Sequence, residues 1–279
     1  MGGILPSMTA PRAFAIAALL PACGPRVRGV DPAPLGEVVV AGIEGALPLD
    51  ARAGGEFAEG HIPGAAHVDW TELTGSDDAG YWGALPPEEA AALLADRGVS
   101  TDRPVVVYGS GLHGSGDDGN VYWVLRWLGH PDVRVLDGGW LSWVAGGGEV
   151  SDTPQPPPAY FELDLQDAVY ADTEDVAQWP GVLLDVRSAE EYAAGHVPGA
   201  VWLEWSEALD DDETLKDEAS LRRLFEGVGI GADSRVVTYC RRGLRAGHTF
   251  MVLDALGIEV RNYVGSWTRW IEEGGAVEP

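Results

Sequence analysis

The feature that most constrains the fold of this chain is an internal repeat. The segment 49–52, Leu-Asp-Ala-Arg, recurs 135 residues later at 184–187 as Leu-Asp-Val-Arg. The segment 60–65, Gly-His-Ile-Pro-Gly-Ala, recurs at the same displacement at 195–200 as Gly-His-Val-Pro-Gly-Ala. Self-similarity of this kind indicates that one structural unit is built twice. We therefore predict two domains with a common fold.

Later matches extend the repeat to nearly the whole chain. The apolar runs ending at Tyr108 and Tyr239 correspond, and Gly-Gly-Trp at 138–140 corresponds to Gly-Ser-Trp at 265–267. A proline-rich stretch separates the copies and predicts a stiff, extended linker. The predicted division is an N-terminal extension at 1–30, a first domain at 31–150, a linker at 151–168 and a second domain at 169–279.

Within each copy, short β-branched runs alternate with helical patterns. The runs 182–186 and 235–239 are typical of buried strands. From 246 to 256 the apolar residues keep helical spacing, and Gly257 stands where a helix C-terminal cap is expected. Strand, helix and strand in this order predict an α/β fold in which each domain is a parallel sheet flanked by helices. Ligands of such folds bind beyond the carboxyl ends of the strands.

Composition excludes several classes of function. Hydrophobic residues make up 46% of the chain and charged residues 22%, as in globular proteins. The net charge of -26 argues against nucleic acid or an anionic membrane surface as a partner, because phosphate is bound mainly by cations. The six histidines are scattered, without Cys/His or carboxylate groups at ligand spacing, so no metal site and no cofactor are predicted.

The second copy carries a candidate nucleophile. Cys240 directly follows the strand-like run and opens the six-residue segment 240–245, Cys-Arg-Arg-Gly-Leu-Arg. Cations beside a thiol, between a strand end and a helix, favour its thiolate form near neutral pH. Arginine also presents a fixed fork of donors that suits oxyanions. We interpret the segment as a reactive cysteine within an anion-binding loop, although ordinary surface arginines are the alternative.

The first copy serves as an internal control. At the position of Cys240 it has Gly109, in a loop without thiol or arginine. That loop spells G-x-G-x-x-G and is followed by Asp137, a nucleotide-binding pattern. Two aspartates follow the third glycine where a helix start would be needed, and they would repel a pyrophosphate. We therefore favour a degenerate copy of the cysteine loop.

Residues found in both copies are more readily explained as scaffold. His196 has a twin in His61, so we expect its ring to bind local backbone in a turn set by proline and glycine. Arg187 has a twin in Arg52, and each follows an aspartate by two residues. A strand-end ion pair is the simplest reading, while a contribution of Arg187 to the positive potential of the substrate site is the alternative.

Cys23 ends a short apolar stretch near the N-terminus. The segment 20–23, Leu-Pro-Ala-Cys, resembles the lipidation box of a bacterial lipoprotein signal, with Cys23 as the acylated residue. The proline and the weakly positive start of the chain are atypical for such a signal. A periplasmic or membrane-anchored lipoprotein and a cytoplasmic protein with an irregular extension are equally compatible with the sequence. Membrane contact is expected only through a lipid on Cys23.

Taken together, these motifs resemble the tandem-domain rhodaneses, or thiosulfate sulfurtransferases. The resemblance rests on an Asp-x-Arg, a Gly-His-[Ile/Val]-Pro-Gly-Ala turn and a Gly-[Gly/Ser]-Trp-x-x-Trp segment in both copies, with Cys-x-x-Gly-x-Arg in the second alone. It covers residues 38–277 and implies an inactive first domain and a catalytic second domain. The implied activity is a sulfurtransferase without a cofactor, whose partners are a small anionic sulfur donor and a thiol or cyanide acceptor.

In the chemistry that the resemblance implies, the Cys240 thiolate takes sulfur from thiosulfate or a similar donor as a persulfide and delivers it to the acceptor. Backbone N–H groups of the loop would cradle the sulfur, and the arginines would bind the anionic donor. The implied site residues are the catalytic Cys240 and the substrate-binding Arg241, Arg242, Gly243, Leu244, Arg245 and Arg187.

The length of the loop bears on two alternatives. Related phosphatases and arsenate reductases use one residue more, so six residues favour sulfur transfer over that chemistry. A persulfide carrier or sensor that serves a protein partner without turnover is the other alternative. Two positions depart from the family pattern: Glu191 stands where relatives have an arginine, which disfavours mercaptopyruvate as donor, and Val264 stands where an aspartate is common.

Overall fold

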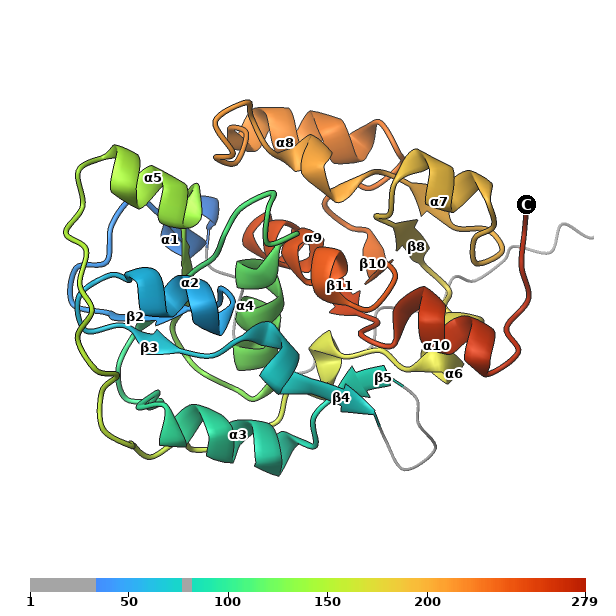
Figure 1. Cartoon of the computed structure of the whole chain (residues 1–279). Coiled ribbons are helices and arrows are strands. Elements are labelled where there is room, and N and C mark those ends of the chain that lie inside the picture. Colours follow the sequence, from blue (N-terminus) through green and yellow to red (C-terminus); the bar gives the residue numbers. More distant parts are fainter. Residues whose placement is uncertain (1–33, 77–81) are drawn as a thin grey trace, which may run out of the picture.

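Two parallel sheets, one in each half of the chain, form the frame of the molecule (Figure 1). The computed structural model describes residues 34–76 and 82–279, so Cys23 and the predicted extension at 1–30 lie outside the described residues. Both sheets are flanked by helices, as the alternation of strand and helix patterns predicts. The α/β fold of two tandem domains is confirmed.

The N-terminal sheet has five parallel strands in the order β1-β7-β6-β2-β3. β2 and β6 are buried at every position, as expected of central strands covered on both faces. A short antiparallel pair, β4 with β5, lies apart from this sheet. The strands of this half are β1 (Val39–Val40), β2 (Leu47–Asp50), β3 (Ala66–His67), β4 (Thr74–Ser76), β5 (Trp82–Ala84), β6 (Val105–Tyr108) and β7 (Val133–Leu136).

The C-terminal sheet repeats this arrangement with four parallel strands in the order β11-β10-β8-β9. Tyr239 at the end of β10 pairs with Asp185 at the end of β8, in the register that Tyr108 and Asp50 adopt in the other half. The carboxyl ends of the central strands therefore meet at one edge of each sheet. The strands are β8 (Val182–Asp185), β9 (Val201–Trp202), β10 (Arg235–Tyr239) and β11 (Glu259–Asn262).

The α-helices surround the sheets, and α4 and α9 lie in the middle of the molecule (Figure 1). The α-helices are α1 (Leu35–Val38), α2 (Gly54–Glu59), α3 (Pro87–Asp96), α4 (Asp117–Trp127), α5 (Gly139–Ala145), α6 (Thr173–Ala177), α7 (Ala189–Ala193), α8 (Glu218–Glu226), α9 (Leu244–Ala255) and α10 (Ser266–Glu272). Short 3-10 turns cover Trp70–Leu73, Asp167–Val169 and Trp205–Ala208. Within the described ranges, no helix is both long and apolar enough to cross a membrane.

Helices α4 and α9 join the two halves by a close crossing. A Cβ atom added at Gly119 would lie 2.3 Å from Cα of His248, and one added at Gly247 would lie 2.6 Å from Cα of Asn120. Glycine at both positions therefore lets the two backbones touch. Farther along the same contact, the Asp254 carboxylate accepts a hydrogen bond from the Tyr122 hydroxyl at 2.7 Å. Buried apolar residues of both halves form one continuous core around this crossing.

Candidate active site

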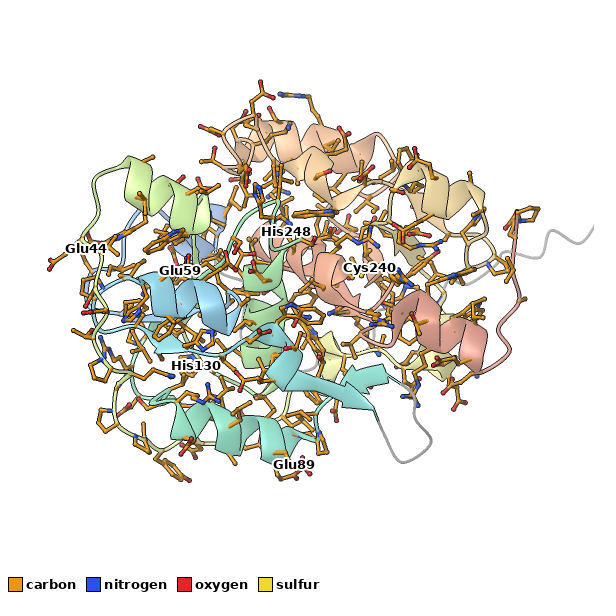
Figure 2. All side chains as sticks on the ribbon, in the orientation of Figure 1. Glu44, Glu59, Glu89, His130, Cys240 and His248 are labelled. Atoms are coloured by element: carbon orange, nitrogen blue, oxygen red, sulfur yellow. The ribbon has the colours of Figure 1, made fainter. Side chains whose placement is uncertain are left out.

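Cys240 follows the last residue of β10 and lies just before α9, in the interior of the molecule (Figure 2). Its side chain is almost fully buried, with 1% of the residue exposed. The backbone N–H of Gly243 donates a hydrogen bond to Sγ at 3.2 Å. The loop thus curls back on its own first residue, so that a backbone donor points at the sulfur. Such inward N–H groups form a concavity that favours an anion.

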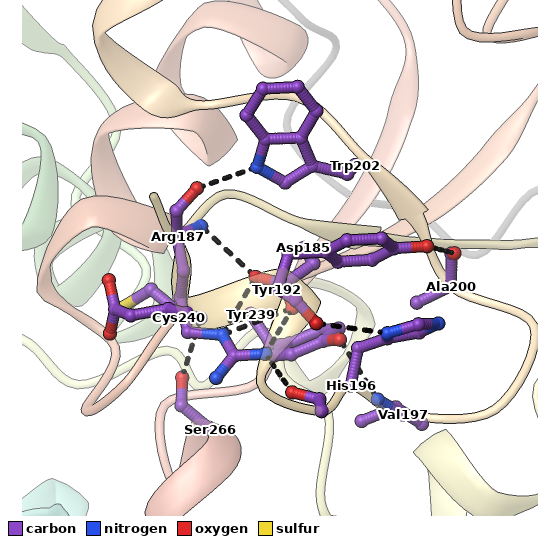
Figure 3. Close-up of polar contacts among 12 residues, drawn as sticks. Asp185, Arg187, Tyr192, His196, Val197, Ala200, Trp202, Tyr239, Cys240 and Ser266 are labelled. Carbon is purple, nitrogen blue, oxygen red and sulfur yellow. Dashed lines mark hydrogen bonds and ion pairs between the residues drawn. The ribbon is translucent and has the colours of Figure 1, made fainter. Parts of the chain in front are cut away.

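Residues at the start of α10 hold the loop from behind. The N–H of Cys240 donates to Oγ of Ser266 at 3.1 Å, as Figure 3 shows, and this hydroxyl donates in turn to the carbonyl of Tyr263. The carbonyls of Cys240 and Arg241 accept hydrogen bonds from the N–H groups of Trp267 and Thr268. Hydrogen bonds to α10 therefore fix the backbone of the loop at Cys240 and Arg241, so that the turn toward Gly243 starts from a held position.

Gly243 is where the loop turns into α9. Its φ of +88° lies in the left-handed region, and an added Cβ would come within 2.8 Å of Cγ2 and of the carbonyl oxygen of Val264. Glycine is required here for both reasons. Val264, the departure from the family pattern whose effect the sequence did not predict, is buried and packs directly against this turn.

The three loop arginines have different environments. Arg241 and Arg242 are exposed beside the buried thiol. Arg245, in the first turn of α9, is partly buried, and its Nη1 and Nη2 donate to the two carboxylate oxygens of Glu191 at 2.7 and 3.0 Å. Burial lowers the pKa of Arg245, but the hydrogen bond to Glu191 and the nearby Cys240 sulfur outweigh this and raise it. The charged guanidinium of Arg245 therefore interacts with the sulfur of Cys240 as well as with Glu191.

Arg187 is held by Asp185. Nε and Nη2 of Arg187 donate to the Asp185 carboxylate, the shortest contact being 2.6 Å, and Nη2 also donates to the carbonyl of Gly195 (Figure 3). The guanidinium lies over the ring of Trp267, 4.5 Å from its centroid. Arg187 is 2% exposed. This is the strand-end ion pair expected from the Asp-x-Arg motif, and a role for Arg187 in substrate binding stays a prediction.

The first copy repeats this ion pair in detail. Arg52 donates to the Asp50 carboxylate and to the carbonyl of Gly60, and its guanidinium lies 4.1 Å from the centroid of the Trp140 ring. The Tyr108 hydroxyl donates to Asp50 as well. Because the arrangement is complete in a half without a thiol, it serves the fold in both halves.

The twin histidines also make matching contacts. Nδ1 of His196 lies 3.2 Å from the carbonyl oxygen of Tyr192, and its ring stacks on the Tyr192 ring. Nδ1 of His61 lies 3.0 Å from the carbonyl oxygen of Phe57, on whose ring it stacks. Both rings therefore bind local backbone in the turn, as the comparison of the two copies predicts.

In the first copy, a carboxylate fills the space that Cys240 occupies in the second. A Cβ added at Gly109 would lie 2.0 Å from Oδ1 of Asp117. That oxygen accepts hydrogen bonds from the N–H groups of Ser110 at 3.2 Å and Asp118 at 3.0 Å. Burial and the neighbouring carboxyl of Asp118 raise the pKa of Asp117 to about 8. The backbone N–H groups of this loop thus bind the Asp117 carboxyl group, a side chain of the same loop.

The sequence-based expectation that no helix starts after this glycine-rich loop was wrong. Helix α4 begins at Asp117, directly after Gly116, which has a φ of +83°. The adjoining cavity, lined by Asp118 and His248 among others, has a volume of about 20 Å³, room for roughly one water molecule. Neither the filled loop nor this cavity accommodates a pyrophosphate.

Restoring a side chain at Gly109 should therefore destabilise the first domain. We expect Gly109→Ala to cost about 1–3 kcal/mol, the usual penalty for overpacking a buried site, because its Cβ meets Asp117. The cost should be smaller when Asp117→Ala is already present. Urea unfolding of both single variants and the double variant measures this coupling, and additive effects would show that Asp117 is not the obstacle.

Sequence reasoning missed two contributors to the site. Ser266 orients the N–H of Cys240, and Glu191 holds Arg245 from 54 positions away in the chain. Glu191 also completes a capping box with Ser188 at the start of α7. The segment 188–191, Ser-Ala-Glu-Glu, is typical of that local pattern. Across residues 34–76 and 82–279, no cluster of three or more His, Cys, Asp or Glu side chains could hold a metal ion.

The family comparison matches both halves. The rhodanese-like domain model matches residues 39–146 and 166–273. The sulfur carrier protein TtuD of Thermus thermophilus is 34% identical over 251 residues, which cover 77% of this chain and 83% of that protein. A thiosulfate sulfurtransferase of Pseudomonas aeruginosa is 33% identical over 242 residues, 80% of this chain and 86% of that protein.

Solved structures share the architecture. The 3-mercaptopyruvate sulfotransferase SseA of Escherichia coli superposes with a TM-score of 0.70 at 25% identity, covering 80% of this chain and 93% of that one. YnjE superposes with a TM-score of 0.73 at 25% identity, and the match covers 84% of this chain and 63% of YnjE. This chain therefore spans less than two thirds of YnjE.

Proposed function

Because the chain belongs to the rhodanese-like family, whose named relatives include sulfurtransferases, we propose that Cys240 carries sulfur from thiosulfate or a similar donor to cyanide or a thiol. The observation that carries the proposal is the cradle of Cys240, with the Gly243 N–H at 3.2 Å from Sγ and three arginines in the same loop. The sister loop, which lacks the thiol, is filled by a carboxylate.

In the proposed reaction the Cys240 thiolate attacks the outer sulfur of thiosulfate. The new Cys240–sulfur bond forms as the sulfur–sulfur bond of thiosulfate breaks, and sulfite leaves with the bonding electron pair. Cyanide then attacks the terminal sulfur of the persulfide. The carbon–sulfur bond of thiocyanate forms as the sulfur–sulfur bond of the persulfide breaks, and Cys240 leaves with the electron pair as a thiolate. The Gly243 N–H and the positive end of α9 stabilise the negative sulfur at each stage.

Intact-mass measurement tests this directly. Protein incubated with thiosulfate should gain one sulfur atom, and cyanide should remove it while thiocyanate appears in the solution. The control is Cys23→Ser, which leaves Cys240 as the one remaining thiol of the chain and should load to the same extent. Failure of every sulfur donor to add mass would refute the proposal.

A second candidate function is that of a persulfide carrier for a protein partner, which the similarity to the sulfur carrier protein TtuD of Thermus thermophilus supports. It predicts the same adduct with negligible turnover toward cyanide or small thiols. A cysteine-based phosphatase is disfavoured by the six-residue loop and would instead hydrolyse an aryl phosphate in a Cys240-dependent way. Lipidation of Cys23, and with it a membrane anchor, stays a prediction.

A further inference from the structure

The carboxylate of Glu191 occupies both terminal nitrogens of Arg245, the last residue of the cysteine loop. A bidentate pair of this kind is the strongest form of carboxylate–guanidinium contact. The Glu191 side chain is 32% exposed and the Arg245 side chain 19%, so solvent screens the pair only in part. Arg245 therefore cannot offer the same fork to the anionic group of a sulfur donor while Glu191 holds it.

Glu191 is itself fixed by the start of α7. Its Oε2 accepts the N–H of Ser188 at 3.2 Å, and its own N–H donates to the Ser188 hydroxyl at 3.3 Å. Burial raises the pKa of Glu191, but the hydrogen bonds from Arg245 and Ser188 outweigh it and lower that pKa. Glu191 is thus a fixed negative charge beside the site at neutral pH, and it offsets the charge of Arg245.

We infer that Glu191 is a positioning residue that sets donor specificity: it holds Arg245 beside Cys240, cancels its charge, and selects sulfur donors with one negative charge over those with two. This inference rests on the proposed sulfurtransferase function and names the donor class for that site. An alkyl thiosulfonate or an alkyl persulfide belongs to the favoured class, and thiosulfate, a dianion, to the disfavoured one. Each further negative charge on a donor is repelled by the Glu191 carboxylate.

The test compares two donors that transfer the same sulfur atom. Methanethiosulfonate carries one negative charge and releases methanesulfinate, whereas thiosulfate carries two and releases sulfite. We expect Glu191→Gln to raise the ratio of kcat/KM for thiosulfate to that for methanethiosulfonate by about threefold to tenfold, the scale of one partly screened charge at close range. The change should lie mainly in a lower KM for thiosulfate.

Two variants serve as controls. Glu191→Asp keeps the charge and should leave the ratio within about twofold of the unmodified protein. Glu56, the twin of Glu191 in the first copy, accepts a hydrogen bond from the Ser110 hydroxyl at 3.1 Å and lies in the half without a thiol. Glu56→Gln should therefore leave the kinetics with both donors unchanged. Thermal denaturation of each variant verifies that it is folded.

The outcomes separate this inference from the proposed function. An unchanged or lower ratio in folded Glu191→Gln would overturn the role of Glu191, while persulfide formation in the unmodified protein would leave the sulfurtransferase proposal intact. An equal rise of the kcat/KM ratio in Glu56→Gln would also overturn the role of Glu191, because the effect would then come from the overall charge of the protein. If neither donor loads Cys240, the proposed function fails, and the donor class inferred here fails with it.

Discussion

Cys240→Ser should abolish sulfur transfer, with turnover of thiosulfate and cyanide falling by roughly four orders of magnitude or more, as expected when a covalent nucleophile is removed. A serine hydroxyl is a far weaker nucleophile toward sulfur than a cysteine sulfur, and its oxygen cannot store the transferred sulfur as a persulfide. Thiocyanate formation measures the rate, and intact mass measures the adduct.

The same variant should stay folded, so that the loss of turnover can be assigned to the missing sulfur. The Gly243 N–H that points at Sγ can donate to a serine oxygen, and the backbone N–H at position 240 keeps its contact with Ser266. Its melting temperature should therefore lie within a few degrees of that of the unmodified protein. Turnover above about one hundredth of the original rate would contradict the assignment of Cys240 as the covalent centre.

Asp185→Ala should destabilise the protein by about 3–5 kcal/mol, the usual cost of leaving one partner of a buried ion pair uncompensated. Asp185 is fully buried and accepts hydrogen bonds from the backbone and the side chain of Arg187. Removing the carboxylate leaves that buried guanidinium, which lies over the ring of Trp267, without its charged partner. The shift of the urea unfolding midpoint measures the loss.

Asp50→Ala is the matched variant, since Asp50 holds Arg52 with the same contacts in the first copy. We expect a loss of similar size, about 3–5 kcal/mol. At temperatures where both variants are folded, Asp50→Ala should retain sulfur transfer, because the loop of Cys240 lies in the other half. A loss under about 1 kcal/mol for both variants would show that the ion pair contributes little to stability.

Much of the fold could be predicted from the sequence because the repeat carries its own evidence. The displacement of 135 residues in the sequence is enough to identify the twin ion pairs and the twin histidines, and the contacts of Arg52 and Arg187 match one for one. The cysteine loop was also recognisable, because its residues are contiguous in the chain.

What could not be predicted depends on contacts between distant residues. The pair of Glu191 and Arg245 joins the first turns of α7 and α9, 54 positions apart in the chain, and no local spacing in the sequence predicts it. The start of α4 at Asp117 was missed because the two aspartates were taken as obstacles to an anion, whereas the Asp117 side chain is buried and accepts hydrogen bonds from the N–H groups of Ser110 and Asp118. Only tertiary structure reveals that Asp117 turns back into its own loop.

The crossing of α4 and α9 makes the two halves of the chain depend on each other. The helix that begins next to the reactive sulfur is in backbone contact with a helix of the half that has none, through Gly119 and Gly247. Because the two copies share one core, the copy without a thiol cannot be deleted without exposing the core of the copy that carries Cys240. The half without a thiol is therefore an obligatory part of the scaffold that surrounds Cys240.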